Sequence, residues 1–231
     1  MKKIFILILL LIVFVLQSCT AKNPSQAIDV PRITELPKVL IIGDSISIGY
    51  TPYVAQILKD KAVVRHNKAN AQHTGTGLKK LDNWLGNTKW DVIHFNWGLW
   101  DLCYRHARSK VQGHRDKING TVTTTLVQYE KNLDKLVSRL NKTGAKLIWA
   151  CTTVVPENEA GRIVGDAKKY NDVAARVMKK YGVKTDDLYT LTKGFPAKLF
   201  KAPGNVHYTK AGYKKIAAKV AGSITAALKH K

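Results

Sequence analysis

A serine that directly follows a short apolar segment is the first residue whose position indicates chemistry. Residues 38–43 read Lys-Val-Leu-Ile-Ile-Gly and are followed by Asp44 and Ser45. The apolar run predicts a buried strand, and the residues behind it show helical spacing. Ser45 would then lie at a strand-to-helix turn, where the free N–H groups of the helix start can hold an oxyanion. Asp44 is expected to support this turn.

A serine hydroxyl needs a general base, and His207 is the candidate. It lies two residues before Thr209, which can cap a final helix. This places His207 after the last predicted strand, on the same sheet edge as Ser45, and none of the other histidines has such a placement. The alternative for His207 is an ordinary surface histidine on a loop.

The elements that must position these residues alternate along the chain. Strands are predicted at 38–43, 62–65, 91–96, 145–150 and 183–186, and helices at 46–59, 77–85, 124–141, 167–181 and after residue 209. Such alternation predicts a parallel sheet that helices cover on both faces. Ligands bind beyond the carboxyl ends of the strands in these sheets, which is where Ser45 and His207 are expected.

The blocks Gly43-Asp44-Ser45 and Val206-His207-Tyr208-Thr209 resemble the first and last sequence blocks of the SGNH (GDSL-type) hydrolase superfamily. The resemblance covers residues 38–228. It implies a flavodoxin-like three-layer α/β/α sandwich with a parallel five-stranded sheet. It also implies ester hydrolysis through an acyl-enzyme, with Ser45 as the nucleophile and His207 as its base.

The middle blocks differ from the family pattern. The family's third block is Gly-x-Asn-Asp, whose Asn donates to the oxyanion, whereas this chain has Trp100 at that position, followed by Asp101 in a supporting role. The second-block glycine corresponds to Ala71, whose backbone N–H can still donate. Asn70 and Asn96 lie nearby in the predicted fold and are candidates to replace the lost amide.

The catalytic acid of the family normally stands three residues before the histidine, and that position is Gly204 here. His207 is therefore expected to act without a carboxylate from its own loop. A backbone carbonyl or a water near the fourth or fifth strand is expected to accept its other N–H, because the wrong tautomer cannot take the Ser45 proton. The altered positions leave a non-catalytic binder of anionic glycan or envelope polymer open as an alternative.

The candidates for substrate binding are aromatic and basic. Trp97 and Trp100 flank Gly98 at the active edge, although for Trp97 the core is favoured over substrate binding, because Trp is highly buried on average. Arg105 belongs to the basic segment 104–117, and Arg162 follows the fourth strand. This segment suits the rim of an acidic substrate site, and a solvated loop is the alternative.

The whole chain is strongly basic, with 38 Lys and Arg against 16 Asp and Glu and a formal net charge of +22. This favours anionic partners such as an acidic polysaccharide or lipid headgroups, or it is a general surface property. No recognised motif for nucleic-acid binding accompanies the charge, so no nucleic acid is expected. No Cys/His spacing indicates a metal site, and no cofactor is expected.

The first residues are typical of a bacterial lipoprotein. Lys2 and Lys3 precede an apolar run that is shorter than the roughly 20 residues of a membrane span, and Leu16-Gln17-Ser18-Cys19 resembles a lipoprotein processing site. We therefore expect a signal peptide at 1–18, an anchor and tether at 19–37 with Cys19 lipidated, and a hydrolase-like domain at 38–231. The protein would lie in the cell envelope, lipid-anchored, on the periplasmic side or at the outer-membrane surface.

Taken together, the residues and the family resemblance favour an exported serine esterase that removes a small acyl group, expected to be acetyl. A carbohydrate substrate is what the resemblance to exported members of the family implies, together with the polar and aromatic residues at the active edge. A lysophospholipase or thioesterase of the same fold is the alternative within the enzymes. The exported compartment would permit a disulfide between Cys103 and Cys151, which follow neighbouring predicted strands.

Overall fold

Five parallel strands form the central sheet of the computed structural model, which describes residues 35–229. They are β1 (Lys38–Ile42), β2 (Val63–His66), β3 (Val92–Phe95), β6 (Lys146–Ala150) and β7 (Lys184–Asp186). Their order in the sheet is β2-β1-β3-β6-β7, which is the flavodoxin-like order. All five lie within two residues of the predicted ranges.

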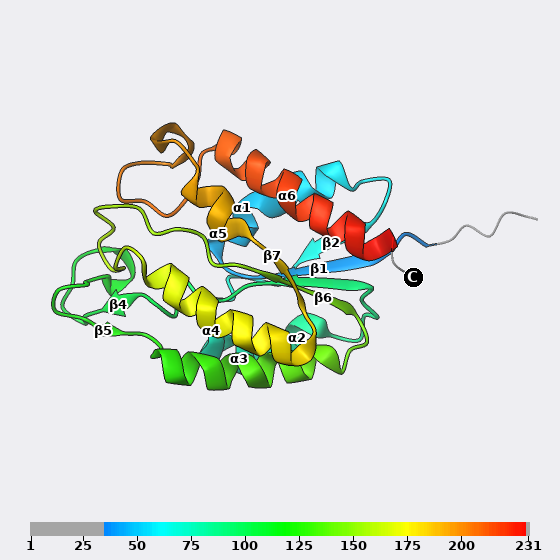
Figure 1. Ribbon diagram of the computed structural model, residues 1–231, viewed down its shortest axis with the longest axis horizontal. Coiled ribbons are helices and arrows are strands. Elements are labelled where there is room, and N and C mark those ends of the chain that lie inside the picture. The colour runs from blue at the N-terminus through cyan, green and yellow to red at the C-terminus, as the bar shows by residue number, and fades with distance from the viewer. Residues whose placement is uncertain (1–34, 230–231) are drawn as a thin grey trace, which may run out of the picture. The chain divides into compact units, whose positions relative to one another are not determined.

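Helices cover both faces of this sheet (Figure 1). α1 (Ser45–Ile57) and α6 (Lys210–Lys229) pack together on one face, and α2 (Thr74–Leu85), α3 (Leu126–Asn141) and α4 (Asp166–Tyr181) pack side by side on the other. The short α5 (Leu188–Lys193) follows β7 on the side of α6. The three-layer sandwich expected from the sequence is confirmed.

Burial explains why these segments take these conformations. Every residue of β3 is buried, as is β1 beyond Lys38, because both are central strands with helices above and below. On α3 the buried side chains recur at helical spacing, at Tyr129, Leu133, Leu136 and Leu140. Each fully buried leucine stabilises the fold by about 1.5–3 kcal/mol.

The carboxyl ends of the strands, where Ser45 and His207 are expected, lie at the left of Figure 1; we call this side of the sheet the catalytic edge. The loops that follow β1, β3, β6 and β7 gather there, beside a small hairpin of β4 (Tyr104–Arg105) and β5 (Thr121–Val122). Two 3₁₀ turns, η1 (Gln112–His114) and η2 (Ala197–Leu199), also lie in these loops. The hairpin, the turns and α5 were not predicted, because two to six residues carry no readable periodicity.

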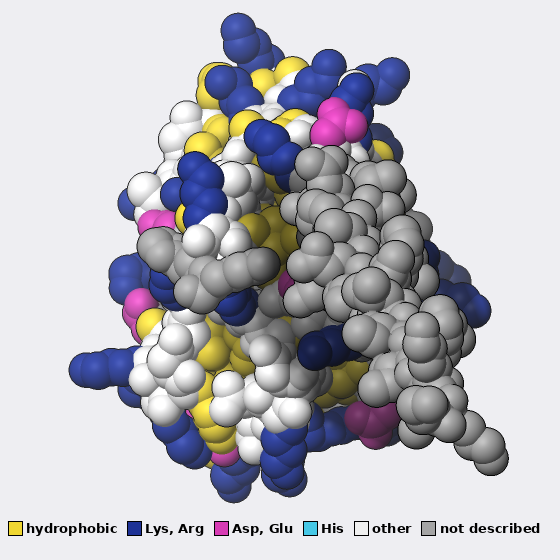
Figure 2. Space-filling view, turned by 90° about the vertical axis from the view of Figure 1, so that its right-hand side faces the viewer, with side chains coloured by type: hydrophobic (Ala, Val, Ile, Leu, Met, Phe, Trp, Pro, Cys, Tyr) yellow, Lys and Arg dark blue, Asp and Glu magenta, His cyan; other side chains and the backbone are white. Residues whose placement is uncertain are grey.

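Two further findings concern the surface of the described part. No helix in residues 35–229 combines the length and the apolar character that crossing a membrane requires. Lys and Arg side chains are spread over the face shown in Figure 2 rather than gathered in one patch. The predicted signal peptide, Cys19 and nearly all of the predicted tether lie outside the described residues.

Candidate active site

The turn that carries Ser45 is held by hydrogen bonds on both sides. Asp44 is the N-cap of α1, and its Oδ1 accepts from the Ile46 N–H at 2.9 Å. The Gly43 N–H donates to Asn67 Oδ1 at 2.9 Å, and a Cβ on Gly43 would lie 2.7 Å from Ser47 Oγ. Ser45 is thus the first residue of the helix and is half-buried. Its backbone N–H makes no hydrogen bond to another described residue and lies at the positive end of α1.

Ser45 and His207 are brought together as predicted. The Ser45 Oγ lies 2.9 Å from His207 Nε2. On the other side of the ring, His207 Nδ1 lies 2.8 Å from Asn205 Oδ1, which also accepts from the His207 backbone N–H at 2.9 Å. An amide oxygen can only accept, so Nδ1 carries the proton and Nε2 offers its lone pair to the Ser45 hydroxyl.

The group that orients the His207 ring differs from the prediction. We expected a backbone carbonyl or a water to accept the second N–H of His207, whereas the side chain of Asn205 does so. The signal was present in the sequence, because Asn side chains often hydrogen-bond the backbone N–H two residues on. The absence of a carboxylate from this loop is as expected: Gly204 has a φ of 68°, and a Cβ there would lie 2.6 Å from the Asn158 carbonyl oxygen.

The surroundings of His207 favour its neutral form. Burial lowers the pKa of His207 below its ordinary value, and the positive charges of Arg162, Lys201 and Arg115 lower it further. A neutral imidazole is the form that can accept the Ser45 proton.

Two of the three expected oxyanion donors are already engaged. The Ala71 N–H donates to the Gly43 carbonyl at 3.0 Å, so it ties the second-block loop to the Ser45 turn. Asn96 Nδ2 donates to the Ala150 carbonyl at 2.7 Å and so links the ends of β3 and β6. The Ala71 N–H and the Asn96 amide were predicted to bind the oxyanion, but these hydrogen bonds already use them. Asn70 uses its Oδ1 to accept from the Gln72 N–H, and its amide nitrogen makes no hydrogen bond within the described residues.

Asp101 supports the site from a distance. Its buried carboxylate accepts from the Thr74 N–H at 3.0 Å and from Thr74 Oγ1 at 2.6 Å. It therefore caps α2 and fixes the loop after β3 against the second-block loop. Burial raises the pKa of Asp101 to about 7, although the hydrogen bonds from Thr74 and Thr124 oppose the rise. Burial likewise raises the pKa of Asp44, and its bond with Ile46 and the charge of Arg162 oppose this.

The aromatic candidates separate into core and edge. Trp97 is completely buried, beside Phe95 and Gly77, in the core position that was favoured for it over substrate binding. Trp100 is half-buried, and the Arg105 guanidinium lies 4.7 Å above the centre of its ring. This pair remains available at the catalytic edge.

The buried carboxylate of Glu159 holds two of the basic residues at this edge, and the sequence did not predict it. Glu159 is fully buried, and its Oε1 accepts from Arg115 Nη1 at 2.6 Å and from Arg162 Nη1 at 2.8 Å. Arg162 is itself 5% exposed and donates from Nε to the Leu99 carbonyl at 2.6 Å. The only hint in the sequence is an acidic residue three positions before Arg162, which many loops share.

Cys103 and Cys151 do not form the disulfide that export would permit. Both are free, Cys103 buried and Cys151 partly buried. Burial raises the pKa of Cys151 to about 12, which makes its thiol unreactive at neutral pH. In residues 35–229 no group of three His, Cys, Asp or Glu side chains is arranged to hold a metal ion.

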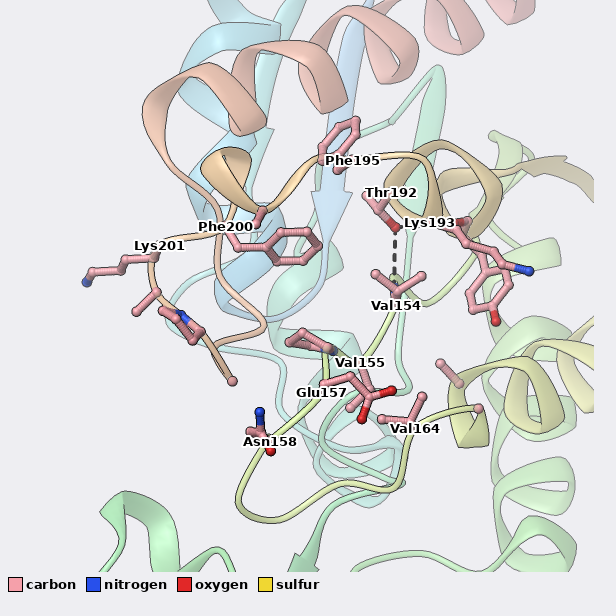
Figure 3. Close-up of a pocket in the computed structure, with 18 of the residues that line it drawn as sticks. Val154, Val155, Glu157, Asn158, Val164, Thr192, Lys193, Phe195, Phe200 and Lys201 are labelled. Atoms are coloured by element: carbon pink, nitrogen blue, oxygen red, sulfur yellow. Dashed lines mark hydrogen bonds between the residues drawn. The ribbon is translucent and has the colours of Figure 1, made fainter.

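An apolar groove of about 890 Å³ lies beside the catalytic loop (Figure 3). Val154, Val155 and Val164 line it from the β6–α4 loop, and Phe195 and Phe200 line it from the segment before α6. Lys193, Lys198 and Lys201 also border it. The groove reaches Asn158 and Gly204, next to Asn205 and His207, whereas neither Ser45 nor His207 lines it.

Comparisons with known proteins agree with this geometry. The model of the GDSL-like Lipase/Acylhydrolase family matches residues 41–215. No curated protein matches the sequence. Among solved structures, the chain is similar to an acetyl xylan esterase, AlAXEase, with a TM-score of 0.65 and 18% identity, covering 81% of this chain and 99% of that one.

Two further structures show the same fold. A lipase/acylhydrolase from Enterococcus faecalis has a TM-score of 0.67 and 18% identity, with 83% of this chain and 96% of that chain covered. A catalytic mutant of Axe2, an acetylxylan esterase from Geobacillus stearothermophilus, has a TM-score of 0.63 and 18% identity, with 81% and 94% covered. Because the family model spans most of the chain and contains both Ser45 and His207, the chain belongs to the GDSL-like lipase/acylhydrolase family and is an ester hydrolase.

Proposed function

We propose that this protein is a serine esterase that removes a short acyl group, acetyl, from a carbohydrate. The observation that carries the proposal is the Ser45–His207 contact of 2.9 Å, with the imidazole held by Asn205 at 2.8 Å. A nucleophile, a base and an orienting group lie in the order that acyl transfer requires.

The reaction follows from this arrangement. Ser45 Oγ attacks the ester carbon while His207 Nε2 takes its proton, and the carbonyl electron pair moves to oxygen. The tetrahedral intermediate expels the sugar alcohol, which receives the proton from His207, and an acyl-Ser45 remains. Water then attacks with His207 again as the base, which releases the acid and restores Ser45.

A carbohydrate substrate is supported by two observations. Two of the similar solved structures are described as acetylxylan esterases. On this chain, Trp100 presents a half-buried ring with Arg105 above it at the catalytic edge, and aromatic rings can pack against sugar rings. The cations near His207 and the net charge of +22 favour an acidic polysaccharide over a neutral one.

A second candidate is a longer acyl substrate, as in a lysophospholipase or thioesterase. The apolar groove that ends at the catalytic loop favours it, because a chain of several carbons could lie between Val155 and Phe200. Acyl length is therefore the property that separates the two candidates.

The experiment compares p-nitrophenyl acetate with p-nitrophenyl octanoate. We expect Ser45-dependent hydrolysis with kcat/KM higher for acetate, whereas a higher value for octanoate would support the second candidate. His207→Ala should lower turnover by about 100- to 10,000-fold in a folded protein. A fluorophosphonate probe should label the wild type and not Ser45→Ala, and labelling that survives this substitution would refute the assignment of the nucleophile.

We further propose that the enzyme is a lipoprotein of the bacterial envelope. The support is the sequence alone, in which a basic start and a short apolar run end at Cys19. An anchor of this kind would hold the esterase close to envelope polysaccharide.

A further inference from the structure

The oxyanion site of this chain lacks the side-chain donor that the family pattern supplies. Trp100 stands where the family resemblance expects an Asn, and the N–H groups of Ala71 and Asn96 that could replace it bind the Gly43 and Ala150 carbonyls. The Ser45 N–H and the Asn70 amide are left among the groups considered so far. Because loss of one oxyanion donor costs about 100- to 1000-fold in rate, another group is expected to contribute.

Arg162 has the geometry of a prepositioned donor. Its side chain is 5% exposed and is held at two points, with Nε donating to the Leu99 carbonyl at 2.6 Å and Nη1 to Glu159 Oε1 at 2.8 Å. No hydrogen bond among the described residues uses its Nη2. Nη2 is therefore left to donate to a further acceptor.

One of the two anchors links this side chain to the surroundings of the nucleophile. Leu99, whose carbonyl Arg162 binds, lines a small cavity together with Asp44 and Ile46, the residues on either side of Ser45. Arg162 is also the first of the charges that lower the pKa of His207, and it lowers that of Asp44. Its charge therefore acts on the catalytic base and on the residue before the nucleophile.

The charge of Arg162 is not cancelled where it lies. Glu159 is its buried counter-ion, but the same carboxylate oxygen also binds Arg115 at 2.6 Å. One negative charge is thus shared by two guanidinium groups, which leaves an excess of positive charge at the catalytic edge. A charged donor in a partly buried site stabilises an anion more strongly than a neutral amide does.

We propose that Arg162 is a catalytic residue that donates from Nη2 to the oxyanion, in the place of the Asn that Trp100 replaces. When Ser45 Oγ bonds to the ester carbon, the carbonyl π electrons move to the carbonyl oxygen. This negatively charged oxygen then accepts a hydrogen bond from the Nη2–H group of Arg162. The guanidinium stays protonated throughout, because arginine side chains are not deprotonated in proteins, and the only transferred proton moves between Ser45, His207 and the leaving alcohol. The proposal rests on the esterase function proposed above.

The test is the kinetics of Arg162→Gln on p-nitrophenyl acetate at pH 8, with Arg115→Gln as the matched control. Both substitutions remove one arginine from Glu159, but only the first removes the proposed donor. We expect kcat to fall by about 100- to 1000-fold in Arg162→Gln with KM changed by less than about threefold. Arg115→Gln removes a charge near His207 but not the proposed donor, so it should cost at least about tenfold less kcat than Arg162→Gln does. Circular dichroism establishes that each variant is folded.

Each outcome decides the question. An Arg162→Gln enzyme that loses no more kcat than Arg115→Gln, or in which only KM rises, overturns the proposal. If Arg162→Gln does not fold, Arg162→Lys decides, because one ammonium cannot hold Leu99 and Glu159 and also reach the oxyanion. Its kcat should then fall at least about tenfold, and a wild-type kcat in folded Arg162→Lys overturns the proposal. A wild type without Ser45-dependent hydrolysis would instead refute the esterase function itself.

Discussion

An amide oxygen holds the catalytic histidine where Ser-His-Asp triads use a carboxylate. Asn205 Oδ1 fixes the tautomer of His207, as an Asp would, but it carries no charge to stabilise the imidazolium that forms during attack. The arrangement resembles the Cys-His-Asn sites in which an amide has the orienting role. Orientation and charge stabilisation are thus separated at this residue, and the two can be tested independently.

Asn205→Asp should restore the missing charge at the same place. A carboxylate beside Nδ1 favours the protonated ring, so the pKa of His207 should rise from its lowered value. Because the neutral ring is the base, the acid limb of kcat/KM against pH should move to higher pH, and the plateau rate should increase. Asn205→Ala should instead lower the plateau rate. An acid limb that stays in place or moves to lower pH in Asn205→Asp would contradict this account.

Gly204→Asp should not have the same benefit, although position 204 corresponds to the usual acid. Its positive φ and the Asn158 carbonyl 2.6 Å from the position of a Cβ leave no room for a side chain. We expect a loss of about 1–3 kcal/mol in the free energy of unfolding, measured by urea denaturation. Gly204→Ala should show a similar loss, and a Gly204→Asp protein as stable as the wild type would refute the strain.

Much of this site was predictable at the level of single residues, and the reason is local. Ser45 and His207 follow strands and precede helices, and such positions can be read from apolar runs and caps. Glu159 and the free Nη2 of Arg162 could not be predicted, because both depend on contacts between loops that are far apart in the sequence. Asn205 lies between these cases, since its bond to the His207 N–H is local and its bond to the ring depends on the rotamer.

Among the elements, α2 has a second cap from another part of the chain, besides its own N-cap His73, whose Nδ1 accepts from the Gly75 N–H. Asp101 lies 27 residues after Thr74, and its carboxylate accepts both the N–H and the hydroxyl of that first helical residue. The strands and long helices were predicted because their periodicity is strong. The cap from Asp101 was not, because it arises only when the loops after β3 and β2 meet. The β4–β5 hairpin was not, because strands of two residues carry no readable periodicity.

Asp101→Asn should change how stability depends on pH. The pKa of Asp101 is about 7 in the folded protein and lies near 3.8 when unperturbed, so the folded state binds more protons between these values. Its contribution to stability is therefore complete below about pH 3.8 and is lost as the pH rises through about 7. The difference in unfolding free energy, variant minus wild type, should increase from pH 4 to pH 8. If the free energies of unfolding of the two proteins changed in parallel with pH, Asp101 would not titrate in this range.

At the scale of the whole molecule, the basic surface and the proposed anchor concern where the enzyme works. Basic side chains are spread over the face shown in Figure 2, so they favour anionic surroundings in general rather than one docking patch. A lipid at Cys19 would add attachment to a membrane, which no described helix supplies by crossing it. The anchor and the domain can be tested separately.

Cys19→Ser should abolish incorporation of labelled palmitate when the full chain is produced in a bacterial host, because the thiol is the expected attachment point. Esterase activity per folded molecule should stay unchanged, since Cys19 lies outside the domain that carries Ser45 and His207. Palmitate labelling that persists in Cys19→Ser would place the anchor elsewhere or show that the label is unspecific.

The two catalytic side chains are separated by 162 positions along the chain. Their contact closes a loop that contains every strand of the sheet except β1, and forming so distant a contact requires ordering most of the domain first. During synthesis, a growing chain can hydrolyse nothing until the segment after β7 has emerged and docked. Recovered activity after denaturation therefore reports the completed fold, whereas secondary structure can return earlier.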